Sequence, residues 1–144
     1  MTVNWESLSG RTVLLDTCAL LDLSVESAKI APSVREDLVD PSTRLIVSAA
    51  SAWEVAVKAR QGKLPGGERL VASWDKSLLD LQAAPLVMDA VDAIRAGSLG
   101  WAHKDPFDRM LVAQATRYNL PLATSDRVIV AAGIVSTIDT RALN

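Results

Sequence analysis

Short runs of apolar and β-branched residues alternate along the chain with longer segments whose apolar residues recur every three or four positions. Five runs have the character of strands, at 12–16, 44–48, 85–88, 121–124 and 134–138. Helical patterns fill the intervals, at about 17–24, 33–40, 51–61, 68–82, 89–97, 106–118 and 127–132. This alternation predicts right-handed βαβ crossovers. We therefore expect an α/β fold, a three-layer α/β/α sandwich around a central parallel sheet of about five strands.

The length and composition agree with one such domain. The chain has 144 residues, of which 49% are hydrophobic and 4% aromatic, the composition expected of helices packed on a parallel sheet. No linker, low-complexity tract or internal repeat divides it. We expect a single domain over residues 1–144, large enough to bury its own core.

The lone cysteine and the apolar stretches bear on the compartment. Cys18 has no second cysteine to pair with, and we expect it to be a small buried residue. The longest apolar stretches, such as 128–135, are too short to span a bilayer, and residues 1–6 lack the order of a signal peptide. The prediction is a cytoplasmic protein with no membrane contact.

Four acidic residues stand at or just after the ends of predicted strands. Asp16 closes the first strand and Asp126 follows the fourth. Glu54 lies near the start of the helix after the second strand, and Asp108 in the first turn of the helix at 106–118. Ligands of parallel α/β sheets bind beyond the carboxyl ends of the strands. We expect all four carboxylates to meet at this edge.

Each acid, taken alone, also has a local structural explanation. Aspartates at the starts of helices accept hydrogen bonds from free backbone N–H groups, which would account for Asp16, Asp126 and Asp105 followed by Pro106. Ser51 and Glu54 have the spacing of a capping box, and Glu54 could pair with Lys58 one turn later. Capping does not require all the acids to lie at one edge, whereas a metal site does.

The types of donor indicate which metal would bind. Carboxylates without a supporting set of His and Cys select Mg²⁺ or Mn²⁺ over Zn²⁺. Several carboxylates close together repel one another, which raises their pKa values unless a cation neutralises them. The clustering therefore predicts a site that favours a divalent cation.

The net charge of −2 limits how nucleic acid could bind, because proteins that grip phosphates usually carry a basic excess. Any such contact must be local. The candidate cations are Lys58, Arg60, Lys63, Lys104 and Arg109, although scattered charges are more often a solvated surface.

Four ordered motifs resemble those of PIN-domain ribonucleases of the VapC type. They are LLDTCALL at 14–21, SAASAWEVAVK at 48–58 running on to GKL at 62–64, HKDPFDRMLVAQA at 103–115 and LATSD at 122–126. The resemblance covers residues 12 to 138. Cys18 departs from it, since relatives often carry Ser or another small or polar residue there.

The resemblance implies roles for the acids. Asp16, Glu54 and Asp108 would be the core acidic residues, with Asp126 completing a set in which Asp16, Asp108 and Asp126 hold metal. Thr17 and Ser125 match hydroxyl neighbours of the acids and could bond a metal-bound water or a phosphate. Supporting or substrate-contacting candidates are Asp105, Arg109 and Lys58; His103 could help to grip substrate or be a surface residue.

The activity that the resemblance implies is Mg²⁺-dependent endoribonuclease cleavage of RNA, with Mn²⁺ possible. The metal would activate a water for in-line attack while Glu54 orients that water or accepts its proton, giving 3′-hydroxyl and 5′-phosphate products. The family also implies a toxin of a type II toxin–antitoxin pair, a VapB-type antitoxin and a homodimer.

An apolar stripe at 70–81 is a candidate groove for the antitoxin's C-terminal segment. Its members are Leu70, Val71, Trp74, Leu78, Leu79 and Leu81. At least half of them are expected to face the core instead.

Rival interpretations remain open. A phosphatase of the HAD type also places an Asp after its first strand, but its second Asp, two residues later, is missing at Cys18. A receiver-like domain fits the order of acids and lysines poorly. A catalytically silent PIN-like protein-binding module is the alternative that is not an enzyme.

Overall fold

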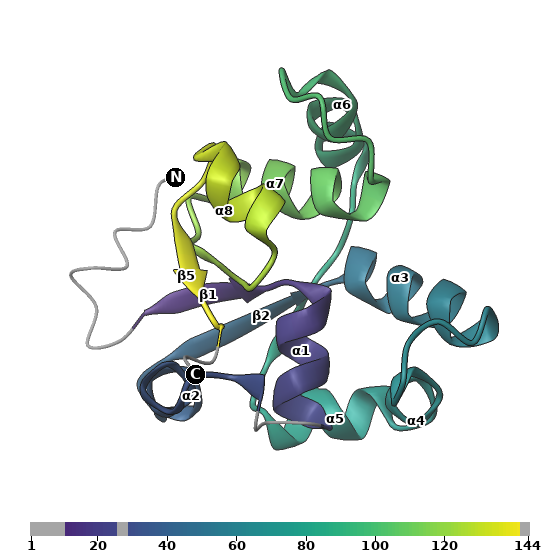
Figure 1. The fold of residues 1–144 in the computed structure, drawn as a ribbon, viewed down its shortest axis with the longest axis vertical. Coiled ribbons are helices and arrows are strands. Elements are labelled where there is room, and N and C mark those ends of the chain that lie inside the picture. The colour runs from purple at the N-terminus through teal and green to yellow at the C-terminus, as the bar shows by residue number, and fades with distance from the viewer. Residues whose placement is uncertain (1–10, 26–28, 142–144) are drawn as a thin grey trace.

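The computed structural model describes residues 11–25 and 29–141, which form a parallel sheet between helices (Figure 1). The strand order is β3-β2-β1-β4-β5, and every neighbouring pair is parallel. The strands are β1 (Thr12–Leu15), β2 (Arg44–Ser48), β3 (Ala84–Leu86), β4 (Leu122–Thr124) and β5 (Thr137–Asp139). The predicted α/β/α fold is confirmed, and the strands differ from the predicted ranges only at their ends.

The helices also follow the predicted order. They are α1 (Thr17–Ser24), α2 (Pro32–Val39), α3 (Ala49–Arg60), α4 (Gly67–Ala72), α5 (Trp74–Asp80), α6 (Ala90–Ser98), α7 (Pro106–Tyr118) and α8 (Arg127–Ala132). None of those in the described residues has the length and apolarity needed to cross a membrane.

One predicted helix, at 68–82, is wrong, because the structure has two helices there. Ser73 separates α4 from α5 with φ −119° and ψ 28°, outside helical geometry. Its hydroxyl donates a hydrogen bond to the Arg69 carbonyl oxygen at 2.8 Å, and side chains that bond the backbone in this way compete with the helical pattern. The apolar periodicity alone did not reveal this break.

The strands alternate their side chains between two cores. Val13 and Leu15 of β1 face a cluster built from α1, α2, α4 and α5, whereas Leu14 faces one built mainly from α7 and α8. Period-two alternation on a sheet buried on both faces explains the continuous apolar run of β1. With β1 central and its neighbours parallel, the carboxyl ends of β1, β2 and β4 meet at one edge.

Polar contacts attach α6 to the rest of the molecule, and α6 stands out beyond α7 in Figure 1. Gln114 of α7 is fully buried; its Nε2 donates to Asp92 Oδ2 and to the Val87 carbonyl oxygen, both at 3.1 Å, and its Oε1 accepts from Ser48 Oγ at 2.6 Å. Arg117 Nη1 donates to Asp92 Oδ1 at 2.8 Å. The buried residues of α6 itself are Asp92 and Ala96.

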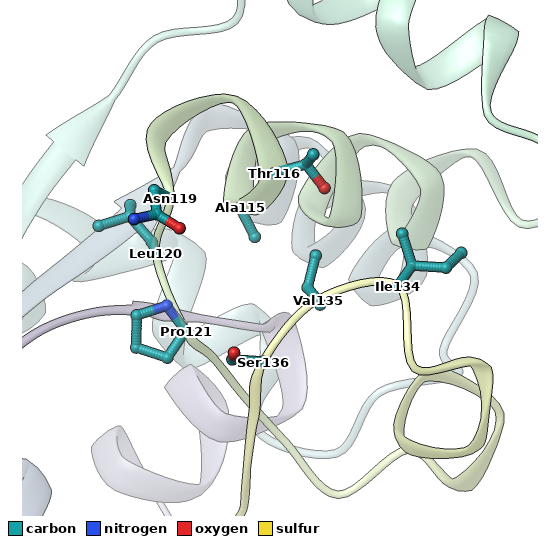
Figure 2. A pocket seen from close by; sticks show the side chains of 8 residues that line it. All are labelled: Ala115, Thr116, Asn119, Leu120, Pro121, Ile134, Val135 and Ser136. Carbon is teal, nitrogen blue, oxygen red and sulfur yellow. The ribbon is translucent and has the colours of Figure 1, made fainter. Parts of the chain in front are cut away.

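A hollow of about 210 Å³ lies at the far end of α7, next to the starts of β4 and β5 (Figure 2). Its lining is apolar or uncharged: Ala115, Thr116, Asn119, Leu120, Pro121, Ile134, Val135 and Ser136. Because none of these side chains ionises near neutral pH, the hollow offers no acid–base chemistry. The titratable side chains that matter gather at the opposite edge of the sheet.

Candidate active site

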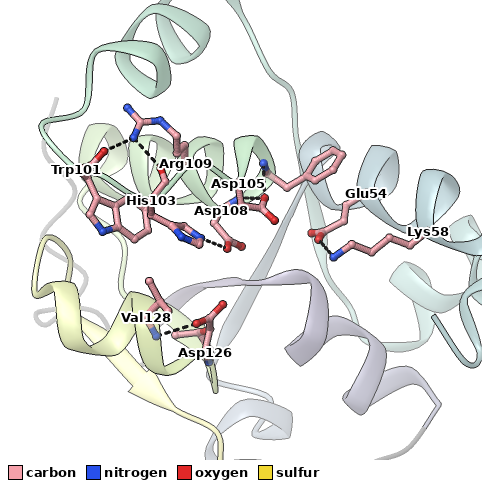
Figure 3. Close-up of polar contacts among 11 residues, drawn as sticks. Glu54, Lys58, Trp101, His103, Asp105, Asp108, Arg109, Asp126 and Val128 are labelled. Atoms are coloured by element: carbon pink, nitrogen blue, oxygen red, sulfur yellow. Dashed lines mark hydrogen bonds and ion pairs between the residues drawn. The ribbon is translucent and has the colours of Figure 1, made fainter. Parts of the chain in front are cut away.

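A cavity of about 220 Å³ lies at the carboxyl edge of the sheet and brings all four predicted acids together. It is lined by Asp16, Thr17, Cys18, Glu54, Lys58, Asp105, Asp108, Ser125 and Asp126. In Figure 3, Glu54 approaches from α3, Asp105 and Asp108 from the start of α7, and Asp126 from the turn before α8. The acids thus converge from four separate segments of the chain.

Asp16 is the most deeply buried aspartate of the cavity, with 5% of its surface exposed. It caps α1, since its Oδ1 accepts from the Ala19 N–H at 2.7 Å. Burial raises the pKa of Asp16 to about 7; bonds from Thr124 and Ala19 lower it, and the charges of Asp108 and Glu54 raise it. A large share of Asp16 is therefore protonated at neutral pH, and a nearby cation would favour its ionised form.

Glu54 and Lys58 form an ion pair along α3. Glu54 lies in the second turn and is 4% exposed, and the Lys58 ammonium donates to its Oε2 (Figure 3). Desolvation lowers the pKa of Lys58. The hydrogen bond to Glu54 and the negative charge of Glu54 raise it and together outweigh desolvation, so the net shift of the pKa is upward. The predicted pair one helical turn apart is confirmed.

The predicted capping box from Ser51 to Glu54 is wrong. The helix begins earlier, with Ser48 as N-cap, whose Oγ accepts from the Ala50 N–H at 3.0 Å. Ser51 is instead buried inside α3, where its Oγ accepts a hydrogen bond of 3.0 Å from Thr17 Oγ1. The Thr17 hydroxyl hydrogen therefore points to α3, which leaves its oxygen lone pairs for the cavity.

The start of α7 holds two acids with different contacts. Asp105 is the N-cap, accepting from the N–H groups of Phe107 at 2.9 Å and Asp108 at 3.1 Å, with Pro106 in the first turn as predicted. Asp108 lies 2.7 Å from His103, measured from Oδ2 to Nε2 (Figure 3). Burial raises the pKa of Asp108; the His103 bond lowers it, and neighbouring carboxylates raise it, so the net shift is upward.

His103 is the residue whose contact the sequence reasoning missed. Its side chain is 24% exposed and its ring lies against Trp101, with the centroids 4.8 Å apart. The available signal was its position two residues before the helix cap Asp105, which keeps it close to the first turn of α7. Only the fold of the loop reveals that its ring turns back to Asp108.

Arg109 does not have the surroundings expected of a phosphate ligand. Its guanidinium donates five hydrogen bonds to backbone carbonyl oxygens, those of Ala96, Gly97, Leu99, Trp101 and His103. A guanidinium has five N–H donors in all. Because every donor is used, we correct the predicted substrate contact of Arg109 to a structural role in holding the loop before α7.

Asp126 follows β4 and caps α8, its Oδ1 accepting from the Val128 N–H at 2.8 Å (Figure 3). Its own N–H donates to Thr124 Oγ1 at 3.0 Å, which fixes the turn. Ser125 lies between them and lines the cavity. The carboxylate of Asp126 therefore both caps α8 and lines the cavity.

Cys18 is exposed, so the prediction of a buried residue is wrong. It lies on the first turn of α1 and lines the cavity. Desolvation, followed by the negative charges of Asp16, Asp22 and Glu54, raises the pKa of its thiol to about 12. The thiol stays protonated at neutral pH and is a poor nucleophile.

The helices that carry Glu54 and Asp108 touch through neighbouring aromatic residues. Trp53 meets Phe107 edge to face, with the ring centroids 4.8 Å apart and the planes at 76°. Such pairs contribute about 1 kcal/mol beyond the area that they bury. The contact holds α3 and α7 together at the cavity.

The donors suit a hard divalent cation, but they are not yet arranged around one. In residues 11–25 and 29–141, no three His, Cys, Asp or Glu side chains already have the spacing of a metal site. The raised pKa values of Asp16 and Asp108 reflect burial and mutual repulsion, which a cation would relieve. The carboxylates fit Mg²⁺ in chemistry and location, and side-chain rotation would be needed to close around it.

Comparison with known proteins agrees with this geometry. A family model described as the PIN domain matches residues 13–134. The structure of VapBC2 from Rickettsia felis, bound to a DNA fragment from its promoter, matches with a TM-score of 0.64 and 13% identity, over 88% of this chain and 97% of that chain. FitAcB from Neisseria gonorrhoeae matches with a TM-score of 0.53 and 19% identity, over 89% of this chain and 97% of that chain.

A domain of a functionally unknown protein from Methanocaldococcus jannaschii also matches, with a TM-score of 0.57 and 18% identity over 94% of each chain. No curated protein matches the chain significantly. At these identities, the likeness to solved structures shows the fold alone.

Proposed function

The chain belongs to the PIN-domain family, and we propose that it is a Mg²⁺-dependent endoribonuclease that acts as the toxin of a type II toxin–antitoxin pair. The observation that carries the proposal is the convergence of Asp16, Glu54, Asp108 and Asp126 on one cavity. Burial and repulsion raise the pKa values of Asp16 and Asp108, as expected of carboxylates that share a cation.

In the proposed mechanism, Asp16, Asp108 and Asp126 would hold Mg²⁺, with Mn²⁺ as a substitute. When bound, the metal lowers the pKa of water and neutralises charge on the phosphate. Glu54 would orient the attacking water and receive its proton on a carboxylate oxygen. The expected products carry a 3′-hydroxyl and a 5′-phosphate.

Lys58 has a second use in this mechanism. Its ammonium lines the cavity and is 37% exposed, so it can move from Glu54 to a phosphate oxygen of the substrate. This movement of the Lys58 ammonium would leave the Glu54 carboxylate ionised and free to accept a proton. The matching role once expected of Arg109 falls to Lys58, because the Arg109 donors are all used.

A cleavage assay tests the proposed activity. Purified protein is incubated with mixed RNA in Mg²⁺ or EDTA, beside Asp16→Asn and the double variant Asp16→Asn with Asp108→Asn. We expect cleavage only by the unaltered protein with Mg²⁺, while circular dichroism shows folded variants. Cleavage retained by the rigorously purified double variant would contradict the proposal, and mapping the cut sites on total RNA would identify the target.

The proposed antitoxin is a small VapB-type protein whose C-terminal segment covers the cavity. Of the expected apolar stripe, Leu70 and Leu78 are buried and Trp74 and Leu81 pack on the core. Val71 and Leu79 are exposed, at 44% and 76%, so only part of the stripe is available to a partner. Co-purification with the product of an adjacent gene, and loss of cleavage in that complex, would support the pairing.

The proposed assembly is a homodimer, and sedimentation of the free protein at micromolar concentration tests it. The HAD-type phosphatase is displaced as an interpretation by the PIN family match. A silent binding module remains the alternative: a protein that binds its partner but shows no Mg²⁺-dependent cleavage of any RNA would support it.

A further inference from the structure

The carboxylate of Asp108 is held by a side chain from outside its own helix. His103 Nε2 lies 2.7 Å from Asp108 Oδ2, and the two side chains are 24% and 16% exposed. An ionised carboxylate only accepts hydrogen bonds, so with Asp108 ionised the imidazole hydrogen must be on Nε2. This bond occupies Oδ2 and leaves Oδ1 for another partner.

The loop that presents His103 is fixed by the residue next to Asp108. Arg109 Nη1 donates to the carbonyl oxygens of His103 at 3.0 Å and Trp101 at 2.6 Å (Figure 3). Its Nη2 donates to the carbonyl oxygen of Leu99 at 2.9 Å. Its Nε reaches Ala96 at the end of α6, at 2.9 Å. The indole of Trp101 supports the His103 ring from the side.

We propose that His103 is the positioning residue for Asp108, and that Arg109 maintains it by clamping the loop at 99–105. The proposal rests on the proposed function, because it assigns the orientation of one metal-binding carboxylate to a named hydrogen bond. These contacts argue against His103 and Arg109 forming a basic surface that binds phosphate. The Nε2 atom of His103 and every donor of Arg109 already have partners within the protein.

The physical benefit is orientation. An Asp side chain on the first turn of a helix has several rotamers, and selecting one before the metal arrives removes an entropic cost of binding. Partners that hydrogen-bond a metal-binding carboxylate typically change metal affinity or activity by about 10- to 100-fold when they are removed. His103 should therefore act on metal affinity and kcat, and less on the KM for RNA.

Two substitutions separate the hydrogen bond from the packing. His103→Phe keeps a ring against Trp101 but removes the N–H, whereas His103→Gln keeps an N–H donor without the ring. Mg²⁺ binding is measured by calorimetry on the protein without RNA, with thermal melting as a check on folding. We expect His103→Phe to weaken Mg²⁺ binding by about 10- to 100-fold, and His103→Gln to restore most of the affinity.

Wild-type Mg²⁺ affinity in a folded His103→Phe variant would overturn the proposal, and so would equal losses in both variants. Arg109→Lys tests the clamp. Its loss of affinity should not add to that of His103→Phe, because both act through one bond; additive losses would overturn the clamp. If Arg109→Lys does not fold, the His103 pair alone decides the proposal.

Asp108→Asn separates this proposal from the proposed function. Loss of Mg²⁺ binding in Asp108→Asn with wild-type affinity in His103→Phe refutes the positioning role and leaves the metal site intact. Unchanged binding in Asp108→Asn refutes the metal site itself, and the positioning role with it.

Discussion

The two sides of the cavity hold their acids in different ways. On α3, Glu54 is paired with Lys58, one turn along the same helix, through a long side chain that is 37% exposed. On α7, Asp108 is hydrogen-bonded to His103, which comes from a loop that Arg109 holds through three carbonyl oxygens, those of Leu99, Trp101 and His103. One partner can leave by rotating a few bonds; the other is fixed by the backbone around it.

The difference indicates a division of labour. A group that must accept a proton benefits from a partner that departs when substrate arrives, as Lys58 can from Glu54. A group that binds a metal benefits from a partner that keeps it in one orientation, the role proposed for His103 beside Asp108.

Removing the charge of each acid should separate binding from chemistry. Asp108→Asn is expected to abolish Mg²⁺ binding and to lower kcat by more than about 1,000-fold. Glu54→Gln should lower kcat by a comparable factor but retain most of the Mg²⁺ binding. Calorimetry and single-turnover cleavage measure the two quantities. Equal loss of Mg²⁺ binding in both variants would show that Glu54 on α3 and Asp108 on α7 do not have the different roles proposed for them.

Asp16 is the most deeply buried aspartate of the cavity, and it should govern stability in the absence of metal. Its pKa rises on folding from 3.8 to about 7, so the folded state binds this proton more tightly than the unfolded state. Stability therefore falls as the pH rises through this window, and the penalty is complete above about 7.

Asp16→Asn should remove that penalty. In EDTA at pH 8 we expect the variant to be more stable than the unaltered protein by up to about 4 kcal/mol, with little difference near pH 4. Urea unfolding at the two pH values measures the effect. A destabilised variant at pH 8 would show that the bonds that Asp16 accepts outweigh the cost of its buried charge.

The smallest effect should come from Lys58, measured as RNA binding in the inactive Asp108→Asn background. Lys58→Gln should weaken binding and reduce the salt dependence by about 0.7 in the logarithmic slope, the amount for one contact to single-stranded phosphate. Lys76→Gln is the matched control, because Lys76 pairs with Asp80 on α5, away from the cavity. A slope that Lys58→Gln leaves unchanged would show that Lys58 never reaches phosphate.

The contrast between the two sides of the cavity also explains what could be predicted from the sequence. The pairing of Glu54 with Lys58 and the capping by Asp105 depend on fixed spacings within one helix, so the residue pattern reveals them. The meeting of the acids followed from the rule that parallel strands end at one edge.

Other features depend on three-dimensional context. The bond between His103 and Asp108 joins a loop to a helix without any periodic spacing, and the five bonds of Arg109 depend on a turn that no motif announces. The choice of Ser48 over Ser51 as the cap of α3 cannot be read from residue type, because serine at either position could cap a helix. Cys18 was placed wrongly because its burial depends on which side of α1 faces the cavity.

The way α6 is attached has a consequence for partial unfolding. Because α6 is held through Asp92, Gln114 and Arg117 more than through apolar burial, its local opening should require less free energy than opening of β1. Amide hydrogens of 90–98 should then exchange with solvent before those of the central strand. Such opening would also remove the Ala96 and Gly97 acceptors of Arg109, so the proposed cleavage activity would be lost while the sheet is still intact.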